Sequence, residues 1–125
     1  MAALGVPLLG AAGLDQPAIR FFTVRDEAGA LLGCGALKRL GADHGEVKSM
    51  RTCDAAIGRG VGSGMLNHLV AIAREACMTR LNLETGNTEQ FAAANRLYER
   101  ESFEPCGPFA NYAPSSFTRF LTRSL

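Results

Sequence analysis

The sequence predicts an α+β, or mixed α/β, domain built on one central sheet. Its 125 residues, 47% of them hydrophobic, suit a single domain (1–125) that buries a substantial core. Three segments rich in β-branched and aromatic residues come first, and two segments with helical periodicity then alternate with further strands. The sequence contains no internal repeat and no low-complexity linker that would divide it.

The first half of the chain predicts three antiparallel strands. Ile19 to Arg25 is rich in β-branched and aromatic residues, and Asp26 to Gly29 forms the turn after it. Leu31 to Leu40 is the returning strand, whose glycines indicate a bend or bulge. A second turn, Gly41 to Gly45, leads into the third strand, Glu46 to Thr52.

The second half predicts two helices between strands. Val61 to Cys77 carries apolar residues at three- and four-residue steps, which is typical of a helix that packs on a core. Arg80 to Thr85 alternates polar and apolar residues as a strand does, and Glu89 to Arg100 again has helical spacing. The remaining elements are a strand that begins at Phe103, a loop from Gly107 to Ser116 and a closing strand from Phe117 to Thr122.

Charge and cysteine content exclude several classes of function. The net charge is +1 with no basic patch, so nucleic acid is not an expected partner. The four cysteines include no C-x-x-C pair, which predicts no metal site and favours free thiols in a reducing cytoplasm. The apolar first 14 residues lack a basic n-region and are too short to span a membrane, so we expect an irregular or helical lead-in.

The segment Gly58 to Gly64 alternates glycine with small or basic residues and leads directly into the first helix. Free N–H groups at a helix N-terminus, together with the helix dipole, form an anion site, most often for phosphate. No lysine follows the glycines as a P-loop requires, and the spacing is not that of a dinucleotide-binding fingerprint. A phosphorylated ligand is the prediction, and a tight turn with no ligand is the alternative.

The order of these motifs resembles a known family. The strand EVKSMRT, the loop IGRGVGSG, the strand LNLETG and the helix ending NRLYERESF are similar to those of GNAT superfamily N-acetyltransferases. The resemblance covers about residues 19–125 and is closest to uncharacterised bacterial members with EIKSMRT, SLETG and GPFGDY-type motifs. It implies a GNAT-like acyl-CoA N-acyltransferase fold, with a mixed, mostly antiparallel sheet flanked by helices.

Only 18 residues precede Ile19, fewer than in full members of that family. The resemblance therefore predicts a chain shortened at its N-terminus, with the first strand of the family missing. A missing strand leaves an open sheet edge, and we expect a homodimer to cover it.

The resemblance implies acetyl-CoA (coenzyme A) as the cofactor. Its pyrophosphate would sit on the N–H groups of Arg59 to Gly64, and the Arg59 side chain would add charge. The family hallmark [QR]-x-x-G-x-[GA] fits literally from Arg59, but counting from the strand and from the helix favours a start at Ile57, which then replaces the usual Gln or Arg. The pantetheine arm would run beside the third strand, where the Met50 N–H is the candidate oxyanion donor. The predicted cofactor-binding residues are Met50, Arg51, Thr52, Ile57, Gly58, Arg59, Gly60, Val61, Gly62, Ser63 and Gly64.

Two residues are the predicted catalytic groups. Tyr98 matches the tyrosine of the family's L-Y motif, which protonates the departing thiolate, although its periodicity alone also suits a core aromatic. Glu46 lies eleven positions before Ile57, as the glutamate base does in relatives, and would accept the ammonium proton directly or through water. The alternatives are a solvated glutamate at a strand start, or His44 as the base.

The acceptor would enter near Glu46 and Lys48. Glu84 is a weaker substrate-binding candidate, and Phe109 and Tyr112 suggest a semi-rigid lid. The predicted enzyme moves an acetyl group to a primary amine of an unidentified small molecule or peptide by direct attack. The alternative is a truncated relative that binds coenzyme A with little or no turnover, and a protein-interaction module is a third reading.

Overall fold

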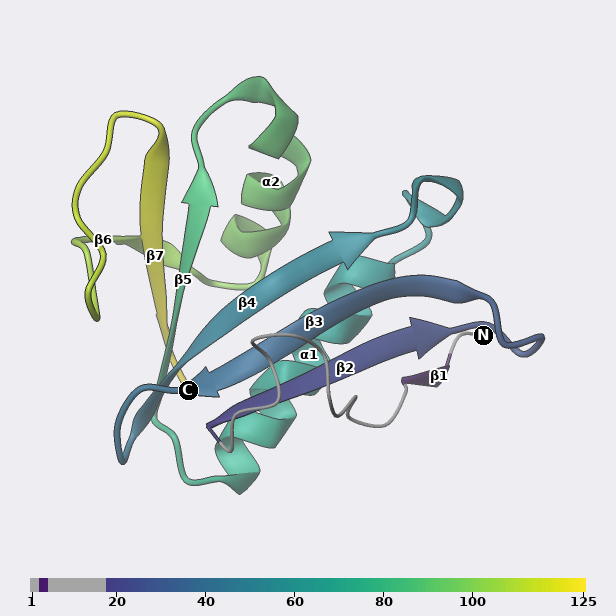
Figure 1. Cartoon of the computed structure of the whole chain (residues 1–125), viewed down its shortest axis with the longest axis horizontal. Helices are drawn as coiled ribbons and strands as arrows, with labels where there is room; N and C mark the ends of the chain where they lie inside the picture. The colour runs from purple at the N-terminus through teal and green to yellow at the C-terminus, as the bar shows by residue number, and fades with distance from the viewer. Residues whose placement is uncertain (1–2, 5–17) are drawn as a thin grey trace.

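The computed structural model of the chain describes residues 3–4 and 18–125 (Figure 1). Within these residues, seven strands form one sheet in the order β1-β2-β3-β4-β5-β7-β6. Only β4 and β5 are parallel, so the predicted mixed and mostly antiparallel sheet is confirmed. The strands are β1 (Ala3–Leu4), β2 (Ile19–Arg25), β3 (Leu31–Arg39), β4 (His44–Thr52), β5 (Arg80–Gly86), β6 (Glu104–Cys106) and β7 (Thr118–Ser124).

Two α-helices pack on this sheet: α1 (Val61–Glu75), which crosses behind β2, β3 and β4, and α2 (Ala92–Arg100), which lies beside β5 (Figure 1). The apolar stripe of α1 drives this packing, because its buried side chains belong to the same core cluster as strand residues from both halves of the sheet. The largest fully buried side chains of that cluster are Met65, Leu66, Leu69, Leu81, Leu83 and Leu121.

Several elements differ from their predicted bounds. β4 begins at His44, two residues early, because His44 pairs with Arg80. α1 ends at Glu75 rather than Cys77, whose backbone is left-handed with φ 65°. The second predicted helix is divided into a 3₁₀ turn, η2 (Glu89–Phe91), and α2.

The prediction that the first strand is missing is wrong, because a short strand, β1, lies at the sheet edge beside β2, and its two residues pair antiparallel with Val24 and Arg25. Apart from these two residues, the predicted lead-in and the rest of the chain before Ala18 lie outside the described residues. The bulge predicted in the glycine-containing strand from Leu31 to Leu40 is confirmed, since β3 has one extra residue opposite Val24 and Arg25.

A second bulge, in β4, was not predicted. Cys34 pairs with Arg51 and Ala36 pairs with Lys48, so β4 carries one extra residue there. Ser49 at this point has a left-handed backbone, φ 56°, and its carbonyl accepts a hydrogen bond from the Cys34 thiol at 3.3 Å. Such a bulge changes which face of the sheet the following side chains occupy.

The two halves of the sheet meet only at one end. β4 and β5 pair at four positions, from His44 with Arg80 to Val47 with Leu83, and then diverge (Figure 1). Beyond Val47, the edge of β4 that faces β5 is no longer paired with that strand. The divergence leaves a V-shaped gap in the sheet, and β4 supplies one of its walls.

Candidate functional site

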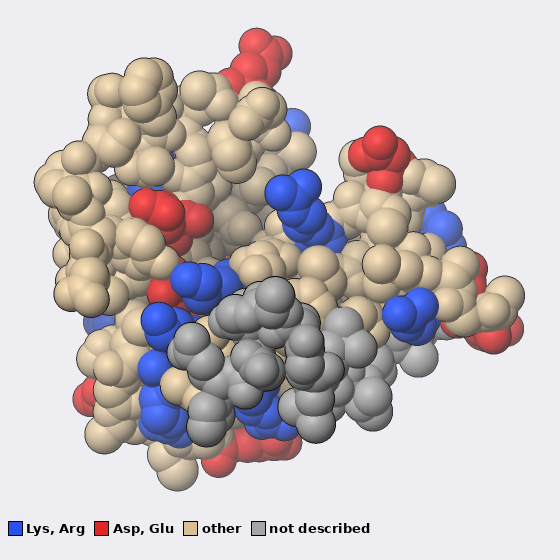
Figure 2. All heavy atoms as spheres, in the orientation of Figure 1, with Lys and Arg blue, Asp and Glu red and all other residues tan. Residues whose placement is uncertain are grey.

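Two cavities lie along the free edge of β4. The first, about 460 Å³, is lined by the glycine loop, the end of β4 and α2, and the second, about 570 Å³, lies between β4, β5 and the start of α2. The hollow is visible in Figure 2, with acidic side chains on one side of it and basic side chains on the other. Both cavities share the lining residues Met50, Arg51, Thr52, Gln90, Ala94 and Tyr98, so they form one continuous groove.

The glycine loop presents free amides to the first cavity. Gly60 caps α1 with a left-handed backbone, φ 79°, which only glycine adopts without strain. The Gly64 N–H bonds the Gly60 carbonyl at 3.0 Å as the first turn of the helix closes, and the Arg59 N–H bonds the Ala56 carbonyl at 3.3 Å. The amides of Arg59 and Gly64 are therefore already bonded, and they drop out of the predicted set of pyrophosphate donors. The amides of the first helical turn, Val61 to Ser63, have no carbonyl one turn earlier to bond.

The need for small residues in this loop fits the hallmark that begins at Ile57. A Cβ on Gly62 would lie 3.0 Å from Leu97 Cδ2, whereas a Cβ on Gly64 would meet nothing within 4 Å. Gly60 is thus required by its backbone and Gly62 by its close neighbour, and these are the two glycine positions of that register; Gly58, with φ 84°, also has a left-handed backbone. Ile57 itself is 65% exposed and lines the first cavity.

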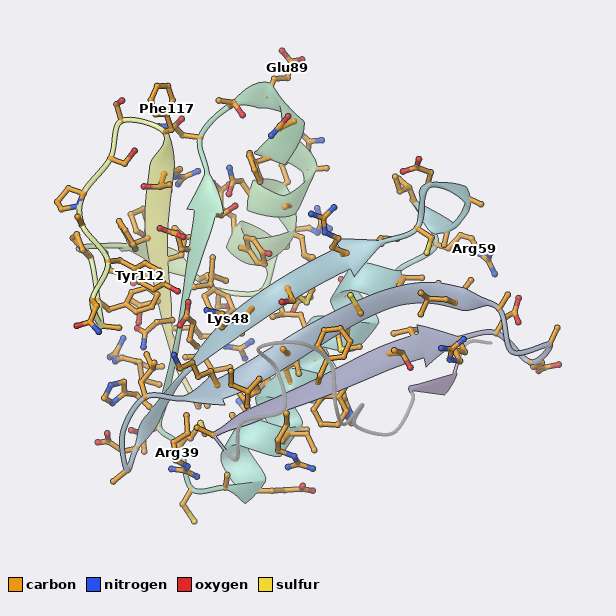
Figure 3. The ribbon with its side chains drawn as sticks, viewed as in Figure 1. Arg39, Lys48, Arg59, Glu89, Tyr112 and Phe117 are labelled. Atoms are coloured by element: carbon orange, nitrogen blue, oxygen red, sulfur yellow. The ribbon has the colours of Figure 1, made fainter. Side chains whose placement is uncertain are left out.

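Arg59 does not line the groove. Its side chain points away from the gap between β4 and β5 (Figure 3), and it is absent from the lining of both cavities. In this structure the Arg59 side chain therefore does not bring the predicted positive charge to the first cavity. The cations that line the first cavity are instead Arg51 and Arg100, beside the backbone donors of the loop.

Tyr98 lies where the two cavities meet. It is on α2, 7% exposed, and its ring packs edge-on against Phe103 at a centroid distance of 6.0 Å. Tyr98 belongs to the core cluster and also lines both cavities, so its core placement is confirmed and its catalytic role stays a prediction. Burial raises the pKa of the Tyr98 hydroxyl above its usual value, which keeps it protonated, and able to donate, at neutral pH.

Glu46 is buried, and Tyr112 covers it. The carboxylate is 3% exposed and accepts a hydrogen bond from the Tyr112 hydroxyl at 2.6 Å. Lys48 Nζ donates to the same hydroxyl at 3.2 Å and lies 4.0 Å from Glu46 Oε2. Figure 3 shows Lys48 and Tyr112 side by side. The interpretation of Glu46 as a solvated strand-start residue is wrong, and the carboxylate lines neither cavity of the groove.

Burial raises the pKa of Tyr112 strongly, and its hydrogen bond to Glu46 and the charges of Glu46 and Glu84 raise it further. The phenol is therefore protonated at neutral pH, as its hydrogen bond to the carboxylate requires. Tyr112 reaches this position from the loop before β7, where its ring packs edge-on against Phe109 and at a tilt against Phe120, with centroid distances of 5.3 and 6.0 Å. The aromatic contacts fix the loop over Glu46.

The other residues predicted to lie near the acceptor line different cavities. Glu84 is exposed on β5 and lines the second cavity, close enough to Tyr112 to affect its pKa. Phe109 instead lines a different cavity of about 360 Å³ together with His44. His44 Nδ1 lies 3.2 Å from Asp43 Oδ1 and does not line the groove, so it is not placed to serve as the base.

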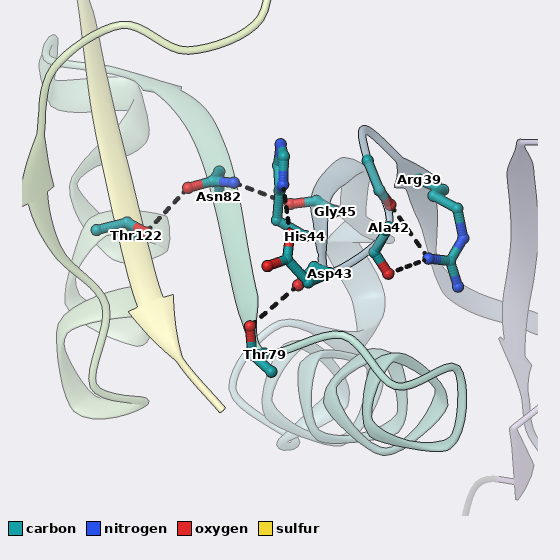
Figure 4. A network of polar contacts seen from close by, with 9 residues as sticks. Arg39, Ala42, Asp43, His44, Gly45, Thr79, Asn82 and Thr122 are labelled. Atoms are coloured by element: carbon teal, nitrogen blue, oxygen red, sulfur yellow. Dashed lines mark hydrogen bonds and ion pairs between the residues drawn. The ribbon is translucent and has the colours of Figure 1, made fainter.

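A polar network holds the closed end of the V together (Figure 4). Buried Asn82 on β5 donates to the Gly45 carbonyl of β4 at 3.2 Å and accepts from Thr122 of β7 at 2.9 Å. The Thr79 hydroxyl donates to the Asp43 carbonyl at 3.3 Å. These bonds fix the point from which β4 and β5 diverge.

Gln90 and Ala94 line both cavities and were not predicted. They lie eight and four residues before Tyr98, so helical spacing from the predicted tyrosine could have found them. In the described part of the chain, no helix is long and apolar enough to cross a membrane. The same residues contain no group of three His, Cys, Asp or Glu that could hold a metal ion.

Comparison with known proteins agrees with this geometry. The model of the Acetyltransferase (GNAT) family matches residues 6–103. The chain is 43% identical over 112 residues to the uncharacterized N-acetyltransferase YedL of Escherichia coli, covering 90% of this chain and 70% of the relative.

Two solved structures share the fold. A putative acyl-CoA N-acyltransferase of Klebsiella pneumoniae has a TM-score of 0.84 and 29% identity, over 90% of this chain and 79% of that one. A GNAT family acetyltransferase of Elizabethkingia anophelis, solved with acetyl-CoA bound, has a TM-score of 0.77 and 15% identity, over 99% and 98% of the two chains. The chain described here therefore belongs to the GNAT family of acetyltransferases and is, as a member, an acyltransferase enzyme.

Proposed function

We propose that this enzyme transfers the acetyl group of acetyl-CoA to a primary amine of a small molecule or peptide. The observation that carries the proposal is the continuous groove, which leads from the free amides of Val61 to Ser63 past Tyr98 to the gap between β4 and β5. A donor with a phosphate end and a reactive thioester end fits a groove with an anion site at one end and titratable groups at the other.

The residues of the first cavity suit coenzyme A. The amides of Val61 to Ser63 would hold the pyrophosphate, and Gly60 and Gly62 leave room for its approach to the backbone. The backbone of Met50 to Thr52, unpaired with β5, would bind the pantetheine arm, and the Met50 N–H would donate to the thioester oxygen. Acetyl-CoA supplies the activated acetyl group and a thiolate leaving group.

Tyr98 and the pair formed by Tyr112 and Glu46 would move the two protons. Glu46 cannot reach the groove directly, because the Tyr112 hydroxyl covers it. Tyr112 itself lines neither cavity, but its hydroxyl lies 3.2 Å from Nζ of Lys48, which lines the second cavity. At that wall Tyr112 would take the proton of the acceptor ammonium while passing its own proton to Glu46 Oε2. Lys48 holds the phenol oxygen through one lone pair and leaves the other for the acceptor.

The reaction balances with these groups. The neutral amine forms a C–N bond to the acetyl carbonyl, the C–S bond breaks, and Tyr98 protonates the departing thiolate. One proton of the ammonium ends on Glu46, and the amide nitrogen loses its second proton to the Tyr98 oxygen through solvent. The products are an N-acetyl amine and free coenzyme A.

Calorimetric titration with acetyl-CoA and a thiol-release assay over a panel of amines test the proposal. We expect acetyl-CoA to bind and to raise the melting temperature, and at least one class of amine to release thiol. Tyr98→Phe should lower kcat, and Glu46→Gln should lower the rate at neutral pH. Binding without any thiol release would favour a coenzyme A-binding protein with little turnover, and the absence of both heat and thermal shift would refute the proposal.

We also propose a cytoplasmic homodimer. The four cysteines, Cys34, Cys53, Cys77 and Cys106, are free thiols, which supports a reducing compartment. On the outer edge of β2, the described residues provide pairing only to Val24 and Arg25, and an edge of this kind pairs readily with a second copy. A monodisperse monomer in sedimentation at micromolar concentration would contradict the dimer.

A further inference from the structure

The second cavity carries two charged side chains, those of Arg51 and Glu84, that the proposed proton transfers do not use. It measures about 570 Å³ and is the part of the groove bounded by β4, β5 and η2, beyond the glycine loop. Cavities of this size hold small molecules rather than extended chains. Its charged lining residues are Lys48 and Arg51 from β4 and Glu84 from β5.

The bulge in β4 brings Arg51 to the same face as Lys48. Met50 packs toward the core, since a Cβ on Gly35 would lie 2.9 Å from its sulfur and 2.7 Å from Met65 Cγ. Arg51, the next residue, therefore projects from the opposite face, and Lys48 is on that face because it contacts Tyr112. In a regular strand, positions 48 and 51 would lie on opposite faces, so the extra residue at Ser49 is what places both cations on this side.

Glu84 projects from the same face of the sheet on the other side of the gap. Its neighbours Leu83 and Thr85 are buried on the core side, so the intervening side chain points away from the core. Figure 2 shows this distribution, with acidic side chains on the β5 side of the hollow and basic ones on the β4 side.

These charges differ in whether they already have partners. Lys48 and Glu46 are linked through the Tyr112 hydroxyl and offset each other's charge. Arg51 and Glu84 both line the cavity, yet in the described part of the chain neither makes a side-chain hydrogen bond or ion pair. One unpaired cation and one unpaired anion thus face the same small cavity from opposite walls.

We propose that the acceptor is a small amine that also carries an anionic group, as an α-amino acid does. The anionic group binds Arg51, whose guanidinium forms paired hydrogen bonds to a carboxylate. The ammonium lies between Glu84 and the Tyr112 hydroxyl, from which its proton passes to Glu46. A polyamine is disfavoured, because Arg51 and Lys48 repel its additional cations. This inference rests on the proposed acetyl transfer and names the substrate class of the same site.

Matched acceptors test the inference directly. We compare α-amino acids with their carboxamides by thiol release, with kcat/KM expressed per ammonium form, because the ammonium is the form that the proposed site binds. The intact enzyme should favour the acids by about tenfold or more, which is the effect of one charge-assisted contact. Equal kcat/KM for acids and carboxamides, or a preference for neutral diamines, would overturn the inference while leaving the acetyl transfer itself intact.

Substitutions test whether Arg51 causes the preference for acids over carboxamides. Arg51→Gln should abolish the preference for acids, Arg51→Lys should restore part of it, and Glu84→Gln should weaken acids and carboxamides alike. Arg74→Gln, on an exposed part of α1 outside both cavities, is the matched control and should keep the preference. If Arg51→Gln instead raises only the KM for acetyl-CoA, the side chain serves the donor and the inference is wrong.

A binding measurement provides a readout besides activity. Calorimetric titration of an α-amino acid into the enzyme saturated with coenzyme A should give heat that Arg51→Gln removes. Because Arg51 is exposed, we expect its variants to fold. The melting temperature of each variant checks this. Heat from the amino acid that Arg51→Gln leaves unchanged would refute the assignment. If acetyl-CoA neither binds nor supports thiol release with any amine, the proposed function fails, and this inference fails with it.

Discussion

The hydrogen bond between Tyr112 and Glu46 gives a quantitative prediction for Tyr112→Phe. The bond is short, 2.6 Å, and its acceptor is a carboxylate that is 3% exposed. Hydrogen bonds to charged groups contribute about 1.5–3 kcal/mol, and the half-buried position of Tyr112 places the expected loss at the lower end, about 1.5–2 kcal/mol. The ring of the new phenylalanine keeps its stacking on Phe109 and Phe120, so the substitution removes the hydroxyl alone.

Urea unfolding followed by circular dichroism at pH 7 measures this loss. Tyr112→Phe, Glu46→Gln and the double variant form a double-mutant cycle, in which we expect the two changes to be coupled by about 1 kcal/mol or more. Tyr98→Phe is the matched control, since in the described part of the chain the Tyr98 hydroxyl makes no hydrogen bond. A change below about 0.3 kcal/mol for Tyr112→Phe, with additive single changes, would refute the assigned geometry.

Other expected outcomes concern the glycine loop, the proposed acid Tyr98 and His68. Gly60→Ala should lower the free energy of unfolding by about 1–2 kcal/mol because of its left-handed backbone, and should weaken acetyl-CoA binding. Gly64→Ala should instead stabilise the helix by about 0.5–1 kcal/mol, since its Cβ meets nothing; urea midpoints compare the two. Tyr98→Phe should lower kcat more than it changes the KM for acetyl-CoA in steady-state assays, and an unchanged kcat would exclude it as the acid. Burial and then Arg20 lower the pKa of His68, so the unfolded chain binds more protons below about pH 6.5 and stability should fall there. His68→Gln should reduce that fall between pH 7.5 and 5.5, and an identical fall in both proteins would contradict the assignment.

Local patterns predicted the elements well, because each depends on residues close together in the sequence. β2 has the bounds expected from its β-branched and aromatic residues, and α1 begins at Val61, directly after the glycine that caps it. Tyr98 was predicted from a motif on one helix, and helical spacing alone extends that prediction to Gln90 and Ala94.

The contacts around Glu46 could not be predicted in the same way. Tyr112 lies 66 residues away, and it reaches the carboxylate only because β7 pairs with β5 and β5 pairs with β4. Spacing along the chain carries no information about such a register. The extra residue in β4 is equally hidden, because the left-handed position is a serine rather than a glycine. Its effect on the face that Arg51 occupies emerges only from the paired strands.

The two cavities that meet at Tyr98 also have a consequence for the order of events. The continuous groove has room for the proposed donor in one cavity and the proposed acceptor in the other, and among the described residues no cysteine lines either cavity to hold the acetyl group in between. If the proposed transfer is right, we therefore expect a ternary complex to form before any product leaves. Double-reciprocal plots at several fixed acceptor concentrations should give intersecting rather than parallel lines, and coenzyme A should not be released in a burst before the amine is added.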